Sequence, residues 1–148
     1  MMRTVCCSVR LRIVVLHPPA GVTFAVQEGP SGLLAPAEVG KDQIAFEFGV
    51  RLGEQVPGEP PNFLGPFAQG PRGGRFVYVN SGQRAGQNES GWERRAKVPL
   101  GGLSWALLRS AQRKRGAVVE ARIDGGGRDG GPACGTVALV GSWRVTRA

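Results

Sequence analysis

The stretch IAFEFGVRL, residues 44–52, decides the fold class. Its apolar residues alternate strictly with others. Ile44, Phe46, Phe48, Val50 and Leu52 fall on one face, and Ala45, Glu47, Gly49 and Arg51 fall on the other. Alternation with a period of two predicts a β-strand with one buried face and one wet face, which is typical of an antiparallel sheet.

Working outward from this strand, similar short runs predict further strands separated by Gly- and Pro-rich turns. The first two, 11–16 and 22–27, follow each other across a turn and predict a β-hairpin. We expect segments 28–42 and 53–74 to be loops, because Gly and Pro punctuate both. The other predicted strands are 75–80, 92–100, 117–123, 136–140 and 143–145.

One helix is expected over 105–115, with Ser104 as its N-cap and Gly116 just beyond its end. No β-α-β alternation is visible, so a parallel sheet is not expected. The fold class is therefore mainly β, with α+β as the alternative class. We expect an antiparallel β-sandwich or open barrel of about seven to eight strands, with one α-helix near residues 104–115. Residues 1–9 are interpreted as an N-terminal extension, and 10–148 as a single β-rich domain.

The composition is basic, with a formal net charge of +8, 24 Gly and 11 Pro in 148 residues. Fourteen of the basic residues lie in 60–148, against five acidic ones. Such a basic half suits a polyanionic partner. We favour the simpler interpretation that a GC-rich genome uses Arg codons often and that the charge serves solubility. Arg10 and Arg12 interrupt the apolar N-terminal run, and no stretch of about 18 apolar residues occurs. We therefore expect a cytoplasmic protein with no secretory signal and no membrane contact.

Motifs for catalysis, metals and cofactors are weak. Cys6, Cys7 and Cys134 have no CxxC spacing, so neither a disulfide framework nor a zinc site is expected. Residues 125–130, GGGRDG, match the GxGxxG pattern of dinucleotide-binding proteins. No helix is predicted after them to hold a pyrophosphate, so we expect no dinucleotide site. His17 precedes two prolines and lacks the partners of a catalytic triad. We expect no metal, no cofactor and no catalytic residue.

The most distinctive segment of the sequence is NFLGPFAQGPRGGRFVYVNSG, residues 62–82. An aromatic, Gly- and Pro-rich loop of this length is either a core plug or a binding lid. The strand at 75–80 is apolar on both faces and is interpreted as central. The basic strand after Trp92 adds cations beside aromatic residues. The ligand-binding candidates are Phe63, Phe67, Gln69, Arg75, Tyr78, Arg95 and Lys97.

The same loop and strand, followed by RRAKVPL (94–100), GAVVEARI (116–123) and GRDGGPACGTVAL (127–139), resemble a bacterial family catalogued as domain of unknown function 5990. The resemblance extends over roughly residues 11–145. It implies a compact cytoplasmic domain of bacterial origin and brings no activity, cofactor or site residue with it.

Three functional hypotheses follow. The first is a non-enzymatic binding module for an anionic or polar small ligand, or for a protein partner. In it Arg75, Arg95 and Lys97 supply charge, Tyr78 and Gln69 hydrogen bonds, and Phe63 and Phe67 an apolar wall. The second is a nucleic-acid-binding β-domain, whose affinity falls steeply with salt. The third is an enzyme that uses carboxylates among Glu47, Glu89 and Glu93, for which no spacing indicates a pair.

Overall fold

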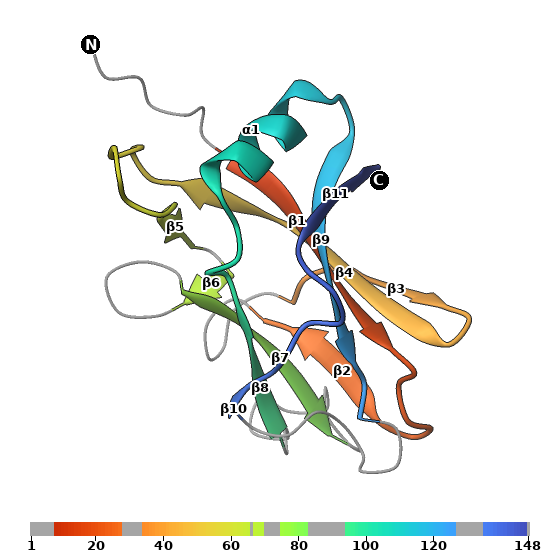
Figure 1. The fold of residues 1–148 in the computed structure, drawn as a ribbon. Coiled ribbons are helices and arrows are strands. Elements are labelled where there is room, and N and C mark those ends of the chain that lie inside the picture. Colours follow the sequence, from red (N-terminus) through yellow and green to blue (C-terminus); the bar gives the residue numbers. More distant parts are fainter. Residues whose placement is uncertain are drawn as a thin grey trace.

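The computed structural model describes residues 8–27, 34–65, 67–69, 75–82, 94–126 and 135–147. These residues form strands in two sheets and one α-helix, so the expected mainly β class with a single helix is confirmed (Figure 1). The elements are β1 (Ser8–Leu16), β2 (Thr23–Val26), β3 (Ala37–Gly40), β4 (Gln43–Leu52), β5 (Phe63–Leu64), β6 (Ala68–Gln69), β7 (Phe76–Gly82), β8 (Arg94–Pro99), α1 (Trp105–Arg113), β9 (Ala117–Asp124), β10 (Gly135–Thr136) and β11 (Arg144–Arg147).

Sheet A has the strand order β11-β9-β1-β4-β3, with β5 paired to the far part of β4. Its centre is β1, which pairs antiparallel with β4 and parallel with β9. The predicted hairpin of 11–16 with 22–27 is therefore wrong, because β4 and β9 occupy both hydrogen-bonding edges of β1. Neither sheet is a parallel sheet, as expected, but both are mixed rather than purely antiparallel, because β1 pairs parallel with β9 and β10 pairs parallel with β8.

Sheet B has the order β10-β8-β7-β2, with β6 also paired to β7. The central position predicted for the strand at 75–80 is confirmed, since β7 lies between β8 and the strands β2 and β6. The chain leaves sheet A after β1, enters sheet B with β2 and returns to sheet A with β3 and β4. Elsewhere consecutive strands pair within one sheet, β3 with β4 and β4 with β5 in sheet A, and β6 with β7 and β7 with β8 in sheet B.

The hydrophobic core lies between the two sheets. Sheet A contributes the predicted inward residues of β4. Of these, Phe46, Phe48, Val50 and Leu52 are buried, and Ile44 is partly buried. Sheet B contributes Val77 and Val79. The period of two in β4 therefore predicts its buried face correctly. Burying apolar surface at about 25 cal/mol per Å² is the main force that holds such layers together.

The helix α1 begins where the sequence predicts, at Ser104, whose Oγ accepts a hydrogen bond from the backbone N–H of Leu107 at 3.1 Å. It ends at Arg113, two residues before the predicted end. Leu108 and Ala111 are buried, and α1 contacts β9, β11 and β1 at one end of sheet A (Figure 1). Gly116 adopts a φ of 75°, the left-handed conformation that lets the chain turn into β9.

Two predicted loops contain short strands. β3 lies inside 28–42 and pairs with β4, while β5 and β6 lie inside 53–74 and pair with β4 and β7. Gly and Pro weaken local strand propensity, but exposed backbone groups at the edge of a strong strand supply hydrogen-bond partners. Within the described ranges, no helix has the length and apolar character needed to span a membrane.

Candidate functional site

The candidate residues of the sequence occupy three separate places. Phe63 and Arg75 line a hollow at one end of the sandwich. Phe67 lies in the core. Tyr78, Arg95 and Lys97 come together on the outer face of sheet B. The backbone of Gln69 pairs with Phe76, which brings β6 beside that face, and the side chain of Gln69 lies outside the described structure.

Two aromatic residues of the long loop point inward. Phe63 is 1% exposed and Phe67 is 9% exposed. The ring of Phe67 packs against that of Phe48, with centroids 4.9 Å apart. Phe67 therefore contributes to the core, as the plug interpretation expects. Phe63 differs, because one side of it forms part of the end hollow.

The end hollow has a volume of about 280 Å³. Its apolar wall comes from prolines and from two nearly fully buried leucines, and its polar groups come from Asn62 and Arg75, both exposed. The lining residues are Pro60, Pro61, Asn62, Phe63, Arg75, Pro99, Leu100, Gly101 and Leu103. Within the described residues, no carboxylate lies within 4.0 Å of the Arg75 guanidinium.

Backbone hydrogen bonds fix the walls of this hollow. The N–H of Gly53 donates to the carbonyl of Asn62 at 2.8 Å, and the N–H of Leu100 donates to the carbonyl of Arg75 at 3.0 Å. The indole of Trp143 donates to the carbonyl of Pro99 at 3.1 Å. Three separate parts of the chain are thereby held around one cavity, which indicates a preformed rather than a collapsed hollow.

The outer face of sheet B carries a cluster of four residues, Phe76, Tyr78, Arg95 and Lys97, which we call the cation–aromatic cluster. The rings of Phe76 and Tyr78 meet edge to face, with centroids 4.9 Å apart. The Arg95 guanidinium lies 3.9 Å from the centroid of Tyr78, and the Lys97 Nζ lies 4.8 Å from the centroid of Phe76. The two cationic side chains lie over the half-buried rings and shield them from water. Their charged groups stay at the surface of the sheet.

Beside this cluster, the polar side chains of Asn80 on β7 and Gln27, just after β2, are buried. Asn80 is 2% exposed and donates from Nδ2 to Oε1 of Gln27 at 3.4 Å, while Arg95 Nε donates to Asn80 Oδ1 at 3.3 Å. Asn80 thus orients the Arg95 guanidinium over Tyr78.

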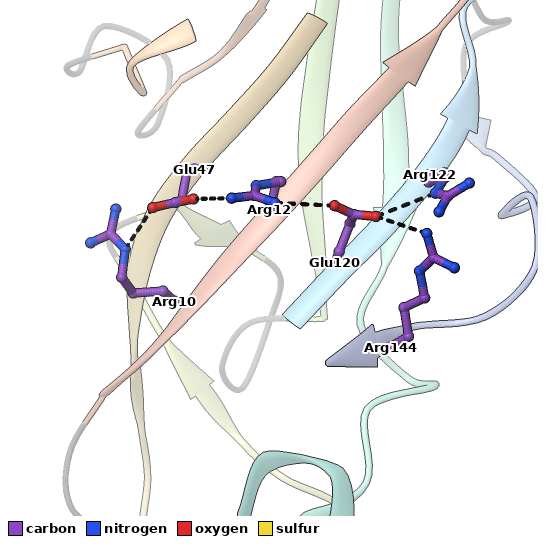
Figure 2. Close-up of polar contacts among 6 residues, drawn as sticks. All are labelled: Arg10, Arg12, Glu47, Glu120, Arg122 and Arg144. Atoms are coloured by element: carbon purple, nitrogen blue, oxygen red, sulfur yellow. Dashed lines mark hydrogen bonds and ion pairs between the residues drawn. The ribbon is translucent and has the colours of Figure 1, made fainter. Parts of the chain in front are cut away.

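The outer face of sheet A carries a feature that the sequence did not reveal, an arginine–glutamate ladder. Glu47, Arg12, Glu120 and Arg144 stand directly opposite one another on β4, β1, β9 and β11 (Figure 2). Arg10 and Arg122 complete it. The N–O distances are 3.0 Å for Arg10–Glu47, 2.8 Å for Arg12–Glu47, 3.3 Å for Arg12–Glu120 and Arg122–Glu120, and 3.4 Å for Arg144–Glu120. Alternation places these charges on one face, but strand register alone brings them together.

The ladder shifts the ionisation of its central members. Burial acts to raise the pKa of Glu47, yet hydrogen bonds from Arg12 and Arg10 outweigh it and hold this pKa below its ordinary value. Burial acts to lower the pKa of Arg12, but hydrogen bonds to Glu47 and Glu120 outweigh it and raise this pKa. Both groups are therefore charged at neutral pH, and the ladder is ionic.

The remaining candidates for chemistry stand as follows. Glu47 belongs to the ladder, whereas Glu89 and Glu93 lie outside the described residues, so the carboxylate-enzyme hypothesis stays a prediction. The three cysteines also lie outside them. His17 and Asp42 both have positive φ, and their exposed side chains form a hydrogen bond between Nδ1 and Oδ2. The described residues contain no group of three or more His, Cys, Asp or Glu arranged to hold a metal ion.

The glycine-rich motif begins at a place where only glycine fits. A Cβ on Gly125 would lie 2.7 Å from the carbonyl oxygen of Leu16. Its N–H donates to that same oxygen at 2.6 Å. Gly125 therefore serves the close approach of β9 to the end of β1. Residues 127–130 of the motif lie outside the described residues.

Residues 9–146 match the model of a family of unknown function (DUF5990). The chain belongs to this family. The resemblance read from the loop and the strand at 75–80 is thereby confirmed. No curated protein and no solved structure matches the chain.

Proposed function

We propose that the protein is a binding module for a small ligand that carries a carboxylate or similar anionic group on an apolar body. The ligand occupies the end hollow, with its anionic group on Arg75. The observation that carries this proposal is the combination, in one cavity, of apolar walls and an exposed guanidinium that no described carboxylate neutralises.

The chemistry of the hollow sets the size and kind of ligand. A volume of about 280 Å³ is near the lower end of the range for ligand pockets, roughly 300–1,000 Å³. Pro60, Pro99 and Leu103 offer an apolar surface, while Asn62 offers both a donor and an acceptor. Arg75 suits a carboxylate because its planar fork donates two parallel hydrogen bonds. A single-ring or short-chain carboxylate meets these requirements.

The cation–aromatic cluster serves this proposal indirectly. Pro99 lines the hollow, and Lys97 and Arg95 precede it on the same strand, β8. Their charges raise the positive potential near the hollow and attract anions, an effect that added salt weakens. Tyr78 supports Arg95 through its ring.

The test is calorimetric titration with benzoate and phenylacetate, using benzamide as the uncharged control ligand. We expect the carboxylates to bind and Arg75→Gln to weaken binding by on the order of tenfold or more, because a charge-assisted bidentate contact is lost. Arg95→Gln is the matched control, since it removes an equal charge outside the hollow, and we expect a change of less than about threefold.

Two results count against the proposal. If Arg75→Gln binds the carboxylates as well as the wild type, the hollow is not the site. If Arg95→Gln and Arg75→Gln weaken binding equally, general electrostatics rather than the hollow holds the ligand.

Single-stranded nucleic acid is the competing ligand. Base stacking needs exposed aromatic faces, and here Arg95 and Lys97 cover the rings of Tyr78 and Phe76. We therefore rank it second. Binding of an oligonucleotide at low salt that disappears in Arg95→Gln and persists in Arg75→Gln would reverse this order.

A further inference from the structure

A second hollow, separate from the end hollow, lies beside the arginine–glutamate ladder at the β9–β11 side of sheet A. Its volume is about 400 Å³, and it is lined by Arg122, Val140, Gly141, Ser142 and Arg144. The turn that forms it is fixed at both ends. The N–H of Val140 donates to the carbonyl of Arg122 at 2.8 Å, and the buried Trp143 is held by its bond to Pro99.

The charges around this hollow are unequal. Arg122 Nε and Arg144 Nη2 both bind one oxygen, Oε2 of Glu120, at 3.3 and 3.4 Å, while Arg12 takes the other oxygen. One carboxylate thus faces three guanidinium groups. Figure 2 shows the Arg122 and Arg144 heads side by side on the same side of Glu120. Each uses a single nitrogen in this contact, so further donors of both forks are available to a ligand.

A hollow at the opposite end of the ladder provides the comparison. It has a volume of about 320 Å³ and is lined by Arg10, Arg12, Pro36, Ala37, Glu38, Ala45 and Glu47. There two arginines face two glutamates, and Glu47 binds both arginines. Positive charge is therefore balanced on the β4 side and in excess on the β9–β11 side, where no acidic residue lines the hollow.

We propose that the hollow lined by Arg122, Ser142 and Arg144 binds a phosphate group, carried by a small phosphomonoester or present as the free ion. Two adjacent guanidiniums match the oxygens of a phosphate dianion, and the Ser142 hydroxyl supplies a neutral donor. Val140, 49% exposed, offers an apolar contact to the organic part of an ester. The inference stands independently of the end hollow.

The experiment is a calorimetric titration of the whole protein with inorganic phosphate and with phenyl phosphate at constant ionic strength. We expect Arg144→Gln to weaken binding by on the order of tenfold or more and Ser142→Ala by about threefold. Ser142→Ala leaves the ladder intact, so it separates binding from folding. Arg10→Gln removes an equal charge at the balanced end of the ladder and leaves the affinity unchanged. Phenyl phosphate also suits the end hollow, so each titration is repeated in the Arg75→Gln background, and the binding that persists there belongs to the hollow beside Arg144.

The pH dependence sharpens the test. The second ionisation of a phosphomonoester has a pKa of about 6, so affinity rises between pH 5 and pH 7 as the dianion forms. Tighter binding of phenyl phosphate identifies an ester as the occupant, and equal binding identifies free phosphate. No binding at millimolar concentration, or an equal loss in Arg10→Gln and Arg144→Gln, would overturn the proposal.

Discussion

The outer faces of the two sheets, which are turned toward solvent, are stabilised by different side-chain contacts. Sheet A covers its outer face with opposite charges that stand directly across the strands, Glu47–Arg12–Glu120–Arg144. On the outer face of sheet B, cationic side chains lie over aromatic rings. Each cation contacts the ring diagonal to it on the neighbouring strand, not the residue directly opposite. Both faces are partly exposed to solvent. One depends on charge balance, and the other depends on aromatic contact.

This difference has an electrostatic consequence. In the ladder Glu47 and Glu120 balance two of the four arginines, and the residual positive charge lies mainly at the β9–β11 end. In the cation–aromatic cluster the rings carry no net charge, so Arg95 and Lys97 keep their full charge toward solvent. Among the described residues, positive charge therefore lies on sheet B, at the β9–β11 side of sheet A, and at the end of α1, where Arg113, Lys114 and Arg115 are exposed.

The largest expected effect comes from Glu120→Gln. The Glu120 side chain is only 10% exposed and binds three arginines. Its loss removes the carboxylate that Arg122 and Arg144 share and one of the two carboxylates on Arg12, so we expect the free energy of unfolding to fall by about 2–3 kcal/mol. Urea denaturation measures this change.

The matched control for that variant is Arg10→Gln, at the exposed end of the ladder, where the arginine side chain is 55% exposed. It should cost no more than about 0.5 kcal/mol. Equal losses in the two variants would show that position in the ladder does not matter.

A smaller effect is expected on sheet B. Tyr78→Leu removes the ring beneath Arg95 and the edge contact with Phe76, and should lower the unfolding free energy by about 1–2 kcal/mol. Tyr78→Phe keeps the ring and should remain within about 0.5 kcal/mol of the wild type. If Tyr78→Phe loses as much as Tyr78→Leu, the hydroxyl rather than the ring stabilises this face.

The smallest effect is the acid titration of the ladder. The pKa of Glu47 in the folded protein lies below its ordinary value of 4.5. The ionised carboxylate therefore stabilises the fold above the unfolded pKa, and this contribution is lost as pH falls through the folded pKa. We expect Glu47→Gln to be less stable than the wild type by about 1 kcal/mol at pH 7.

Denaturation at several pH values between 3 and 7 checks this prediction. The difference between wild type and Glu47→Gln should narrow below pH 4.5. A difference that stays constant or widens at low pH would contradict the ion-pair account. Tyr78→Leu serves as the control, because its deficit involves no carboxylate and should not follow pH in this range.

Sequence patterns predicted what depends on near neighbours. The alternation of Ile44–Leu52 assigned the buried face of β4, and Ser104 marked the start of α1 through its hydroxyl. Three of the seven candidate residues, Tyr78, Arg95 and Lys97, also lie together on sheet B. Their role in binding remains a prediction. The single site drawn from loop and strand was too simple, since Phe67 lies in the core.

The sequence by itself determined the strands, their inward faces, the helix and the basic charge, because propensity, alternation and capping act within a few residues. Only the tertiary structure decided the partners. Arg12 and Glu120 are 108 positions apart in the chain, and their contact depends on the parallel pairing of β1 with β9. The end hollow likewise needs the loop before β5, the start of β7 and the end of β8 in one place. No local pattern encodes such contacts, because register between distant strands is set by packing of the whole core.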